Sequence, residues 1–330
     1  MLDAIPTVRF EERTAPLVGF GAGKVILLGE HGGVYGHPVL AGPLSHGVEA
    51  RAVPARHCRL VLPETLAPPA RRTLERAFAR AAEACHWPRV EVSLETDLAM
   101  SMGLGSSGAL SVACARVLLR AAGKRASLAE VTAVAWLMEQ EFHGTPSGVD
   151  HTTSAWRRLL LYSKQSGARQ GQARPVDCPR PLHVVVAMAG ERGPTRHTLE
   201  ALRDRHARWS KRYDRVLREV GRLANEGARA VEAGELEALG DAMNVNHGLL
   251  AALGLSSAAL DEMVHRLRGL GALGAKLTGA GGDGGAVIGL FDDPGPALAE
   301  LERLGIHCFG SQLAGPVTTR PHIRSQAPLP

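Results

Sequence analysis

Ser101-Met-Gly-Leu-Gly-Ser-Ser-Gly-Ala-Leu-Ser111 joins an alternating segment, residues 90–95, to an apolar segment, residues 112–122. The alternation of apolar and polar residues predicts a strand, and the apolar segment predicts a buried helix. The glycines between them permit positive φ angles and a close approach of the backbone to a bound group. The free N–H groups of the helix and the positive end of its dipole would then face that group. This stretch therefore predicts an anion-binding loop, with a phosphate as its natural ligand.

The segment Gly103–Gly108 also fits the GxGxxG pattern of dinucleotide-binding folds, and Glu130 follows at about the 20-residue spacing of that class. In such folds, however, the acidic residue ends the second strand of a βαβ unit. Here Glu130 completes Ser127-Leu-Ala-Glu130, a capping box that begins another helix. We therefore favour a phosphate loop, with a dinucleotide site and a purely structural glycine turn as the alternatives.

Length and composition are those of a globular protein with room for two domains. The chain has 330 residues, of which 45% are hydrophobic and 4% aromatic, and its formal net charge is +5. A hydrophobic fraction of this size supports a sizeable core. The modest charge suits small anionic substrates, and no basic stripe interleaved with aromatic residues points to nucleic acid.

Cysteine usage and hydropathy bear on the surroundings of the protein. The five cysteines are scattered and form no CxxC pair, which favours a reducing compartment and argues against a structural zinc site. Residues 1–9 contain no apolar signal core, and no run approaches the roughly 18 apolar residues of a membrane span. We expect a soluble, cytoplasmic protein with no membrane association.

Hydrophobic periodicity predicts an α+β architecture in both halves of the chain. Strands are expected at residues 8–10, 17–20, 24–28, 48–53, 58–62, 90–95, 159–162, 182–188, 286–291 and 307–313. Helices are expected at residues 71–85, 112–122, 128–142, 199–223, 236–253, 257–270 and 297–304, and a turn-rich loop at 143–150. The composition turns polar at residues 165–181, which predicts a boundary between a domain of residues 1–175 and a domain of residues 176–330.

A second glycine-rich stretch, Lys276-Leu-Thr-Gly-Ala-Gly-Gly-Asp-Gly-Gly285, lies far from the first in the sequence. Its five glycines exceed the number that a simple turn needs. We therefore expect a second cluster of backbone N–H groups that binds anionic oxygens. A flexible linker is the alternative interpretation.

Four charged side chains are candidates for chemistry. Lys24 and Glu30 lie six positions apart, so an extended strand would point both to the same side. Glu139 and Asp150 lie eleven positions apart, on a predicted helix and in the loop after it. One of these carboxylates could hold a divalent cation while the other accepts a proton or orients a hydroxyl. Taken alone, each acid is more typical of a surface position or a helix cap.

Three motifs in this order resemble the GHMP kinase superfamily: residues 23–36, Leu104-Gly-Ser-Ser107 and residues 276–285. Within the superfamily, residues 23–36 together with His143-Gly-Thr-Pro-Ser-Gly-Val-Asp150 look most like the mevalonate kinases. The segments Gly193–Arg196 and Asn246–Ser256 also match that family. The resemblance covers essentially the whole chain, and the combination of motifs is specific although no single motif is.

The resemblance implies an N-terminal domain like ribosomal protein S5 domain 2, a ferredoxin-like C-terminal domain, and binding of ATP and substrate between them. It also implies Mg²⁺-assisted phosphorylation of the primary hydroxyl of mevalonate to 5-phosphomevalonate, a step of isoprenoid precursor synthesis. A phosphomevalonate kinase or another GHMP small-molecule kinase is the alternative with the same fold. A non-catalytic ligand sensor and a nicotinamide oxidoreductase are alternatives of other classes. A homodimer would be compatible with all of these.

Carried over by position, the resemblance implies roles for individual residues. Asp150 matches the catalytic aspartate and Lys24 the lysine beside it, while Glu139 and Ser107 match the magnesium ligands. The nucleotide phosphate loop corresponds to Ser101, Met102, Gly103, Leu104, Gly105, Ser106 and Ser107. The mevalonate site corresponds to Glu30, His31, Thr195, Gly279 and Ala280.

Several positions depart from the family pattern: Met100 and Ser101 replace a proline and a glycine, Gly32 and Gly33 replace an Ala-Val pair, and the other departures are Gly108 and Asp283. Gly108 replaces the usual alanine, which costs about 0.5–1 kcal/mol of helix stability unless the backbone needs the freedom. Asp283 adds a negative charge to a loop that is expected near phosphates or substrate. No matched catalytic position is lost.

Overall fold

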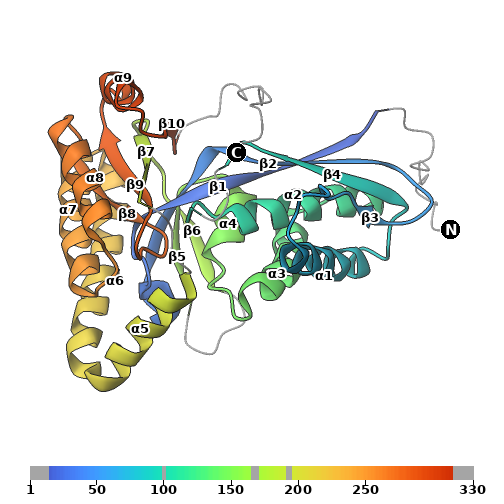
Figure 1. The fold of residues 1–330 in the computed structure, drawn as a ribbon, viewed down its shortest axis with the longest axis horizontal. Helices are drawn as coiled ribbons and strands as arrows, with labels where there is room; N and C mark the ends of the chain where they lie inside the picture. The colour runs from blue at the N-terminus through green and yellow to red at the C-terminus, as the bar shows by residue number, and fades with distance from the viewer. Residues whose placement is uncertain (1–14, 99–101, 165–170, 191–194, 315–330) are drawn as a thin grey trace.

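The computed structural model describes residues 15–98, 102–164, 171–190 and 195–314, with residues 195–197 described by their backbone alone. In the first half, the elements are β1 (Leu17–Leu28), the 3₁₀ helix η2 (Gly32–Tyr35), β2 (Val39–Pro54), β3 (Arg59–Leu60), α1 (Pro68–Ala84), β4 (Val90–Thr96), α2 (Ser106–Ala121), α3 (Leu128–His143), α4 (Val149–Trp156), β5 (Leu160–Ser163) and β6 (Gln172–Pro175). In the second half, they are β7 (His183–Ala189), α5 (Thr195–Arg208), α6 (Ser210–Ala233), α7 (Leu236–Ala252), α8 (Ala258–Gly269), β8 (Gly274–Thr278), β9 (Gly285–Phe291), α9 (Gly295–Arg303) and β10 (Cys308–Gln312). This mixture confirms the predicted α+β class (Figure 1).

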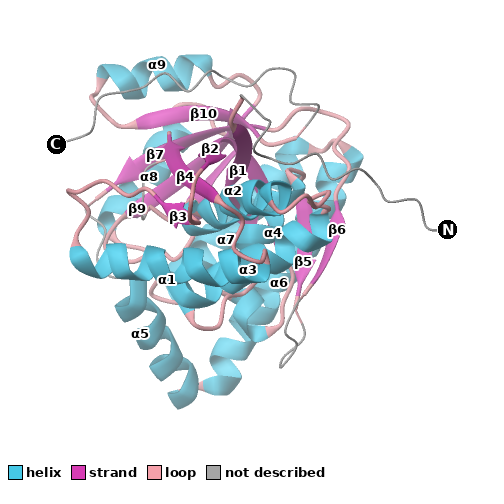
Figure 2. Cartoon of the chain, turned by 90° about the vertical axis from the view of Figure 1, so that its right-hand side faces the viewer, coloured by secondary structure: helices cyan, strands magenta, loops and turns pink. Residues whose placement is uncertain are grey.

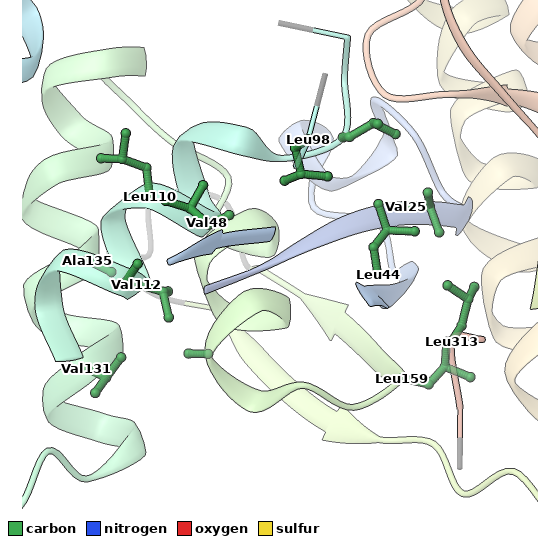
Figure 3. Packing of buried hydrophobic residues seen from close by; sticks show 14 of the residues in the cluster. Val25, Leu44, Val48, Leu98, Leu110, Val112, Val131, Ala135, Leu159 and Leu313 are labelled. Atoms are coloured by element: carbon green, nitrogen blue, oxygen red, sulfur yellow. The ribbon is translucent and has the colours of Figure 1, made fainter. Parts of the chain in front are cut away.

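The first sheet has six strands in the order β3-β4-β2-β5-β6, with β1 paired to β2. Helices α1–α4 lie together on one side of it (Figure 1), and α2 packs directly on β1 and β2. Apolar side chains of α2, such as Leu110 and Val112, fill the space between α3 and the sheet (Figure 3). The phosphate-loop helix predicted from the sequence is thus the buried centre of this half.

The second sheet is antiparallel and has the order β10-β7-β9-β8. Counted along the chain, these strands are the fourth, first, third and second of a β-α-β-β-α-β unit, which is the ferredoxin-like arrangement that the resemblance implied. Helix α8 packs on β7, β8 and β9, while α7 packs on β8 and α6 on α7. Figure 2 shows α9 next to β10 at one edge of the molecule, and β10 also packs against β2 of the first sheet.

The chain passes from the first sheet to the second between Pro175, where β6 ends, and His183, where β7 begins. This change of sheet supports the proposed division into residues 1–175 and 176–330. Within the described ranges, no helix is both long enough and apolar enough to span a bilayer.

The first strand is longer than predicted, because its glycines serve packing rather than turning. Residues 17–20 and 24–28 belong to one continuous strand, β1. A Cβ atom on Gly21 would lie 1.9 Å from the carbonyl oxygen of Ala109, and one on Gly19 would lie 2.7 Å from that of Ala113. Glycine inside a strand can mark such a close backbone approach, here to α2, as well as a turn.

Other boundaries also differ from the sequence prediction. The expected strand at residues 48–53 is the end of the longer β2, and the expected strand at 8–10 lies outside the described residues. The predicted helix at 199–223 is interrupted at Trp209, where α5 turns back so that His206 Nε2 lies 2.7 Å from Asp214 Oδ1 of α6. Four short elements were missed: η2, α4, β6 and β8. Their length explains the failure, since periodicity is weak over so few residues.

We expect Gly21→Ala to destabilise the protein, because the added methyl group would overlap the α2 backbone. Overpacking of this kind costs about 1–3 kcal/mol of unfolding free energy. Denaturant unfolding monitored by circular dichroism measures the change. Gly248→Ala is the control, because this exposed position in α7 has no heavy atom within 4 Å of the added Cβ. Equal stability of wild type and Gly21→Ala would contradict the packing argument.

Stability should also fall as the pH is lowered, partly through His151 of α4. This side chain is 2% exposed, packs edge-on against Trp136, and burial lowers its pKa from 6.5 to about 4. Because its folded pKa is depressed, the neutral ring stabilises the fold above pH 6.5, and this contribution is lost as the pH falls toward 4. A shift of this size corresponds to up to about 3 kcal/mol.

The measurement is urea unfolding across this pH range for wild type and His151→Phe, which keeps a ring but cannot titrate. The variant should lose less stability than wild type between pH 6.5 and 4. Parallel pH profiles for the two proteins would show that His151 does not contribute.

Candidate active site

The N-terminus of α2 presents free amides toward one side of the molecule. The helix begins at Ser106 after Gly105, which has φ +71°, and no side chain caps it. The first N–H groups of a helix lack partners within it, so those of Ser106, Ser107 and Gly108 are free to bind an external anion. Among the predicted phosphate-loop residues, Ser101 lies outside the described residues, and Met102 is partly buried against the core.

The two glycine-rich stretches lie side by side, as the sequence analysis expected. A Cβ atom on Gly279 would lie 2.9 Å from the carbonyl oxygen of Gly103, and one on Gly103 would lie 3.3 Å from that of Thr278. The second loop is anchored as well, because the Gly282 amide donates a 3.0 Å hydrogen bond to Leu255 O. These contacts disfavour the flexible-linker interpretation.

Lys24 and Asp150 meet beside the first glycine-rich loop and the start of α2. Lys24 projects from β1 with its Nζ 3.3 Å from Asp150 Oδ1, and Nζ also donates to Gly103 O at 3.2 Å. The lysine is nearly buried, whereas the aspartate side chain is 28% exposed in the first turn of α4. A Cβ atom on Gly105 would lie only 2.7 Å from Lys24 Cγ, so this loop glycine makes room for the lysine.

Gly108 has a packing role rather than a conformational one. A Cβ atom there would lie 2.9 Å from the Cβ of Asp150 and equally close to its carbonyl carbon. The replacement of the family's usual alanine therefore lets α4 approach α2 at the position of the carboxylate. Asp283 is exposed, so its charge does not require a partner within the protein.

Glu139 and Ser107 lie next to each other beside the Lys24–Asp150 pair. Glu139 is 1% exposed, and Ser111 donates a 3.3 Å hydrogen bond to its Oε1. Burial, and secondarily the charge of Asp150, raise the pKa of Glu139 to about 8, while hydrogen bonds from Ser107 and Ser111 oppose this shift. His143 joins the cluster, with Nε2 3.0 Å from Ser107 Oγ and 3.9 Å from Glu139 Oε2.

The oxygen atoms of Ser107 and Glu139 are suitable ligands for Mg²⁺. This cation prefers oxygen donors and usually keeps several water or phosphate ligands beside one or two protein groups. Within the described residues, no cluster of three or more His, Cys, Asp or Glu side chains could hold a metal by itself. The donor set therefore fits a cation that is shared with a phosphate ligand, and not a closed structural site.

The predicted substrate residues divide into two groups. His31 and Ala280 are in contact, because the ring Nε2 of His31 lies 3.0 Å from Ala280 O. Burial lowers the pKa of His31 to about 4, so the ring is neutral at pH 7, and Nε2 carries the hydrogen while Nδ1 can accept one. Gly279 borders the same place through its contact with Gly103.

Glu30 and Thr195 are the other group. The Glu30 side chain is fully buried, with Oε1 bound to Lys276 Nζ and Oε2 accepting a 3.0 Å hydrogen bond from Asn246 Nδ2. In this arrangement it offers no free oxygen to a substrate, and it lies beyond the end of β1 at Leu28, not on the strand with Lys24. Thr195 begins α5, and its side chain lies outside the described residues.

Sequence reasoning placed Lys276 in the glycine loop, but it lies in the fully buried strand β8. It also missed the contacts of Ser111 and His143 with the Glu139 cluster. For Lys276 a signal existed, since a single charge between Ala275 and Leu277 in a buried strand requires an internal partner. The partner itself, 246 positions away, could not be identified from spacing.

Comparison with known proteins identifies both halves of the chain. The family profile described as GHMP kinases N terminal domain matches residues 71–158, and the one described as GHMP kinases C terminal matches residues 214–309. The chain is 31% identical to the mevalonate kinase of Pyrococcus horikoshii over 290 residues, covering 79% of this chain and 84% of that protein. It is 32% identical to the mevalonate kinase of Thermococcus sibiricus over 291 residues, covering 79% and 85%.

Similarity in three dimensions agrees with these matches. The crystal structure of L. major mevalonate kinase in complex with R-mevalonate superposes with a TM-score of 0.79 and 25% identity, covering 92% of this chain and 97% of that one. Both domain profiles, the extended sequence identity and the shared fold lead to the same conclusion. The chain belongs to the mevalonate kinase family of the GHMP kinases.

Proposed function

We propose that this protein transfers the γ-phosphoryl group of ATP to the primary hydroxyl of mevalonate, forming 5-phosphomevalonate. The contact between Lys24 and Asp150 carries the proposal, because it places a cation and a partly exposed carboxylate beside the free amides of α2. The relatives named mevalonate kinase support the choice of acceptor, since they match over most of their length.

The ATP phosphates would bind where the two glycine-rich loops meet. The loop of residues 101–107 and the leading amides of α2 would surround phosphate oxygens, and the helix dipole would offset their charge. Gly279 and Ala280, which border the first loop, would lie next to the transferring group. Phosphoryl transfer depends mainly on such alignment and charge neutralisation.

Mg²⁺ would be held by the Ser107 hydroxyl and the Glu139 carboxylate. When bound, it would neutralise phosphate charge. The burial of Glu139 supports this proposal, because burial and the nearby charge of Asp150 raise the pKa of this carboxyl to about 8, and a bound cation would offset that effect. His143 lies against Ser107 and would restrict the orientation of that hydroxyl.

Asp150 would accept the proton of the substrate hydroxyl as the substrate oxygen forms its bond to the γ-phosphorus. The bond between that phosphorus and the bridging oxygen breaks, and ADP leaves with the electron pair. The Lys24 ammonium lies beside Asp150 and would offset negative charge that develops on the transferring group. Because Lys24 also donates to Gly103 O, its position relative to the phosphate loop is fixed.

Mevalonate would bind between His31, the loop of Gly279 and Ala280, and the start of α5 at Thr195. The neutral His31 ring donates from Nε2 to Ala280 O, which leaves Nδ1 as an acceptor for a substrate hydroxyl. Such an acceptor favours a ligand with a hydroxyl at this point over one without it.

A substrate comparison tests the function directly. ADP release is measured with mevalonate, phosphomevalonate, homoserine and galactose as acceptors. We expect kcat/KM for mevalonate to exceed the others by at least about 100-fold, the scale of discrimination that a site with matched hydrogen-bonding groups provides. Good turnover of another acceptor with none of mevalonate would overturn the proposal, and absence of turnover with every acceptor would favour a sensor.

Asp150→Asn should separate binding from catalysis. The amide cannot accept the proton, so we expect kcat to fall by about 10²–10⁴-fold, the range for loss of a general base. ATP binding should persist, because the phosphate loop is unchanged; a ligand at 100 times its dissociation constant stabilises the fold by about 2.7 kcal/mol, which a thermal-shift assay detects.

The matched control is Asp177→Asn, which removes an exposed carboxylate paired with Arg158 and should leave kcat unchanged. Wild-type kcat in Asp150→Asn would remove this residue from the mechanism. Loss of ATP stabilisation in the same variant would show that its effect is structural.

A further inference from the structure

We propose that Glu30, Lys276 and Asn246 form a buried junction between the two halves of the protein, and that this junction positions Lys24 and His31 for phosphoryl transfer. Glu30 then acts as a positioning residue and makes no contact with the substrate. The inference rests on the proposed function and adds two positioning residues, Lys276 and Asn246, to the candidate site.

The junction is completely enclosed. Glu30, Lys276 and Asn246 each have 0% exposure. Lys276 Nζ binds Glu30 Oε1 and also donates to Leu277 O at 2.6 Å, and Asn246 Nδ2 donates to Glu30 Oε2 at 3.0 Å. Both carboxylate oxygens are therefore occupied by protein groups, and water has no access to them.

The three residues come from separate elements of both halves. Glu30 follows β1 of the first sheet, Lys276 lies in β8 of the second, and Asn246 lies in α7. A second contact joins the same two strands, because Ile26 N donates to Thr278 Oγ1 at 2.9 Å and that hydroxyl donates to Ile26 O at 3.1 Å. The end of β1 is therefore attached to β8 at two points, through Thr278 at Ile26 and through Lys276 at Glu30.

Groups of the candidate site lie before and after Glu30 in the chain. Lys24 precedes it on β1, and its Nζ contacts both Asp150 and the first glycine loop. His31 follows Glu30 directly, with φ +60°, and its ring reaches Ala280 in the second glycine loop. A displacement of β8 along β1 would thus change the relative positions of both loops, the lysine and the histidine together.

A buried ion pair is suited to fixing such a position and poorly suited to adding stability. Removing two charges from water costs more than their attraction returns unless the geometry is close to ideal, so neutral residues of the same volume are often as stable. Burial lowers the pKa of Lys276, and the neighbouring Glu30 opposes this shift. The two charges disfavour any other position of β8 relative to β1, because a shift would leave Glu30 or Lys276 buried without a partner.

The test is a double-mutant cycle of Lys276→Met, Glu30→Gln and their combination, in the full-length protein. Steady-state kcat and the KM values for ATP and mevalonate are measured at a temperature well below the melting temperature of the least stable variant. We expect each single variant to lower kcat by about 10–100-fold, as misplacement of catalytic groups by about 1 Å does. The KM for mevalonate should change by less than about threefold, because binding of the ground state is little affected.

The combined variant decides between coupling and independent roles. If the two residues act as a positioning pair, the double variant should lose no more kcat than the more impaired single variant. Each single substitution already removes the interaction between them. If Glu30 instead contacts mevalonate, Glu30→Gln alone will raise the KM for mevalonate, and the two losses of kcat/KM will multiply. That result would overturn the proposal.

Ser311→Ala is the matched control. Ser311 Oγ accepts a 3.0 Å hydrogen bond from Ser45 N, which also joins the two sheets but involves no residue of the candidate site. This variant should lower the melting temperature without changing kcat. The same pattern in all junction variants, a lower melting temperature with unchanged kcat, would show a purely structural role and overturn the proposal.

Asn246→Ala keeps the proposal testable if Lys276→Met fails to fold. It removes the contact to Glu30 Oε2 and leaves the ion pair, so kcat should fall with an unchanged KM for mevalonate, though less than in Lys276→Met. If kcat is unchanged in this variant, the junction does not include Asn246. Should the wild-type protein phosphorylate another acceptor, the same cycle is measured with that acceptor, so that failure of the junction and failure of the substrate assignment are separate results.

Discussion

The candidate site depends on one constraint: two loops from opposite halves of the chain are so close that their backbones are in contact. Gly103 and Gly279 have no side chains at the point of contact, and either Cβ atom would press on the other loop. Because no side chain separates them, the amides at the start of α2 and the second loop border the same space. This arrangement brings Lys24, Asp150 and His31 to the same site, since each contacts or adjoins one of the two loops.

Much of this could be predicted from the sequence because the signals are local. The phosphate loop and α2 follow from glycines between a strand pattern and an apolar helix, and the ferredoxin-like half follows from family resemblance and is confirmed by its strand order. The expectation that Lys24 and Asp150 would meet is confirmed at 3.3 Å. The roles assigned to the individual site residues stay proposals.

The errors have a common physical origin, because a residue's partner decides its role and the partner is distant in sequence. The sequence pattern predicts two strands at residues 17–20 and 24–28, although they form one strand whose glycines accommodate the backbone of α2. The sequence pattern places Lys276 in an anion-binding glycine loop, although it lies in the core against Glu30. The motif around Glu30 implies a place in the substrate pocket, although Lys276 and Asn246 hold both oxygens of its carboxylate.

The packing of Lys24 along Gly105 has a consequence for how this enzyme can change over evolution. The loop takes its shape around the lysine stem, which fills the volume that a side chain at position 105 would need. Substitutions in the loop and at the lysine are therefore epistatic, since neither can be accepted without regard to the other. Under the proposed function, nucleotide binding and acid–base chemistry would therefore share one block of residues, and new acceptor specificity would arise more readily through changes in the second loop than in the first.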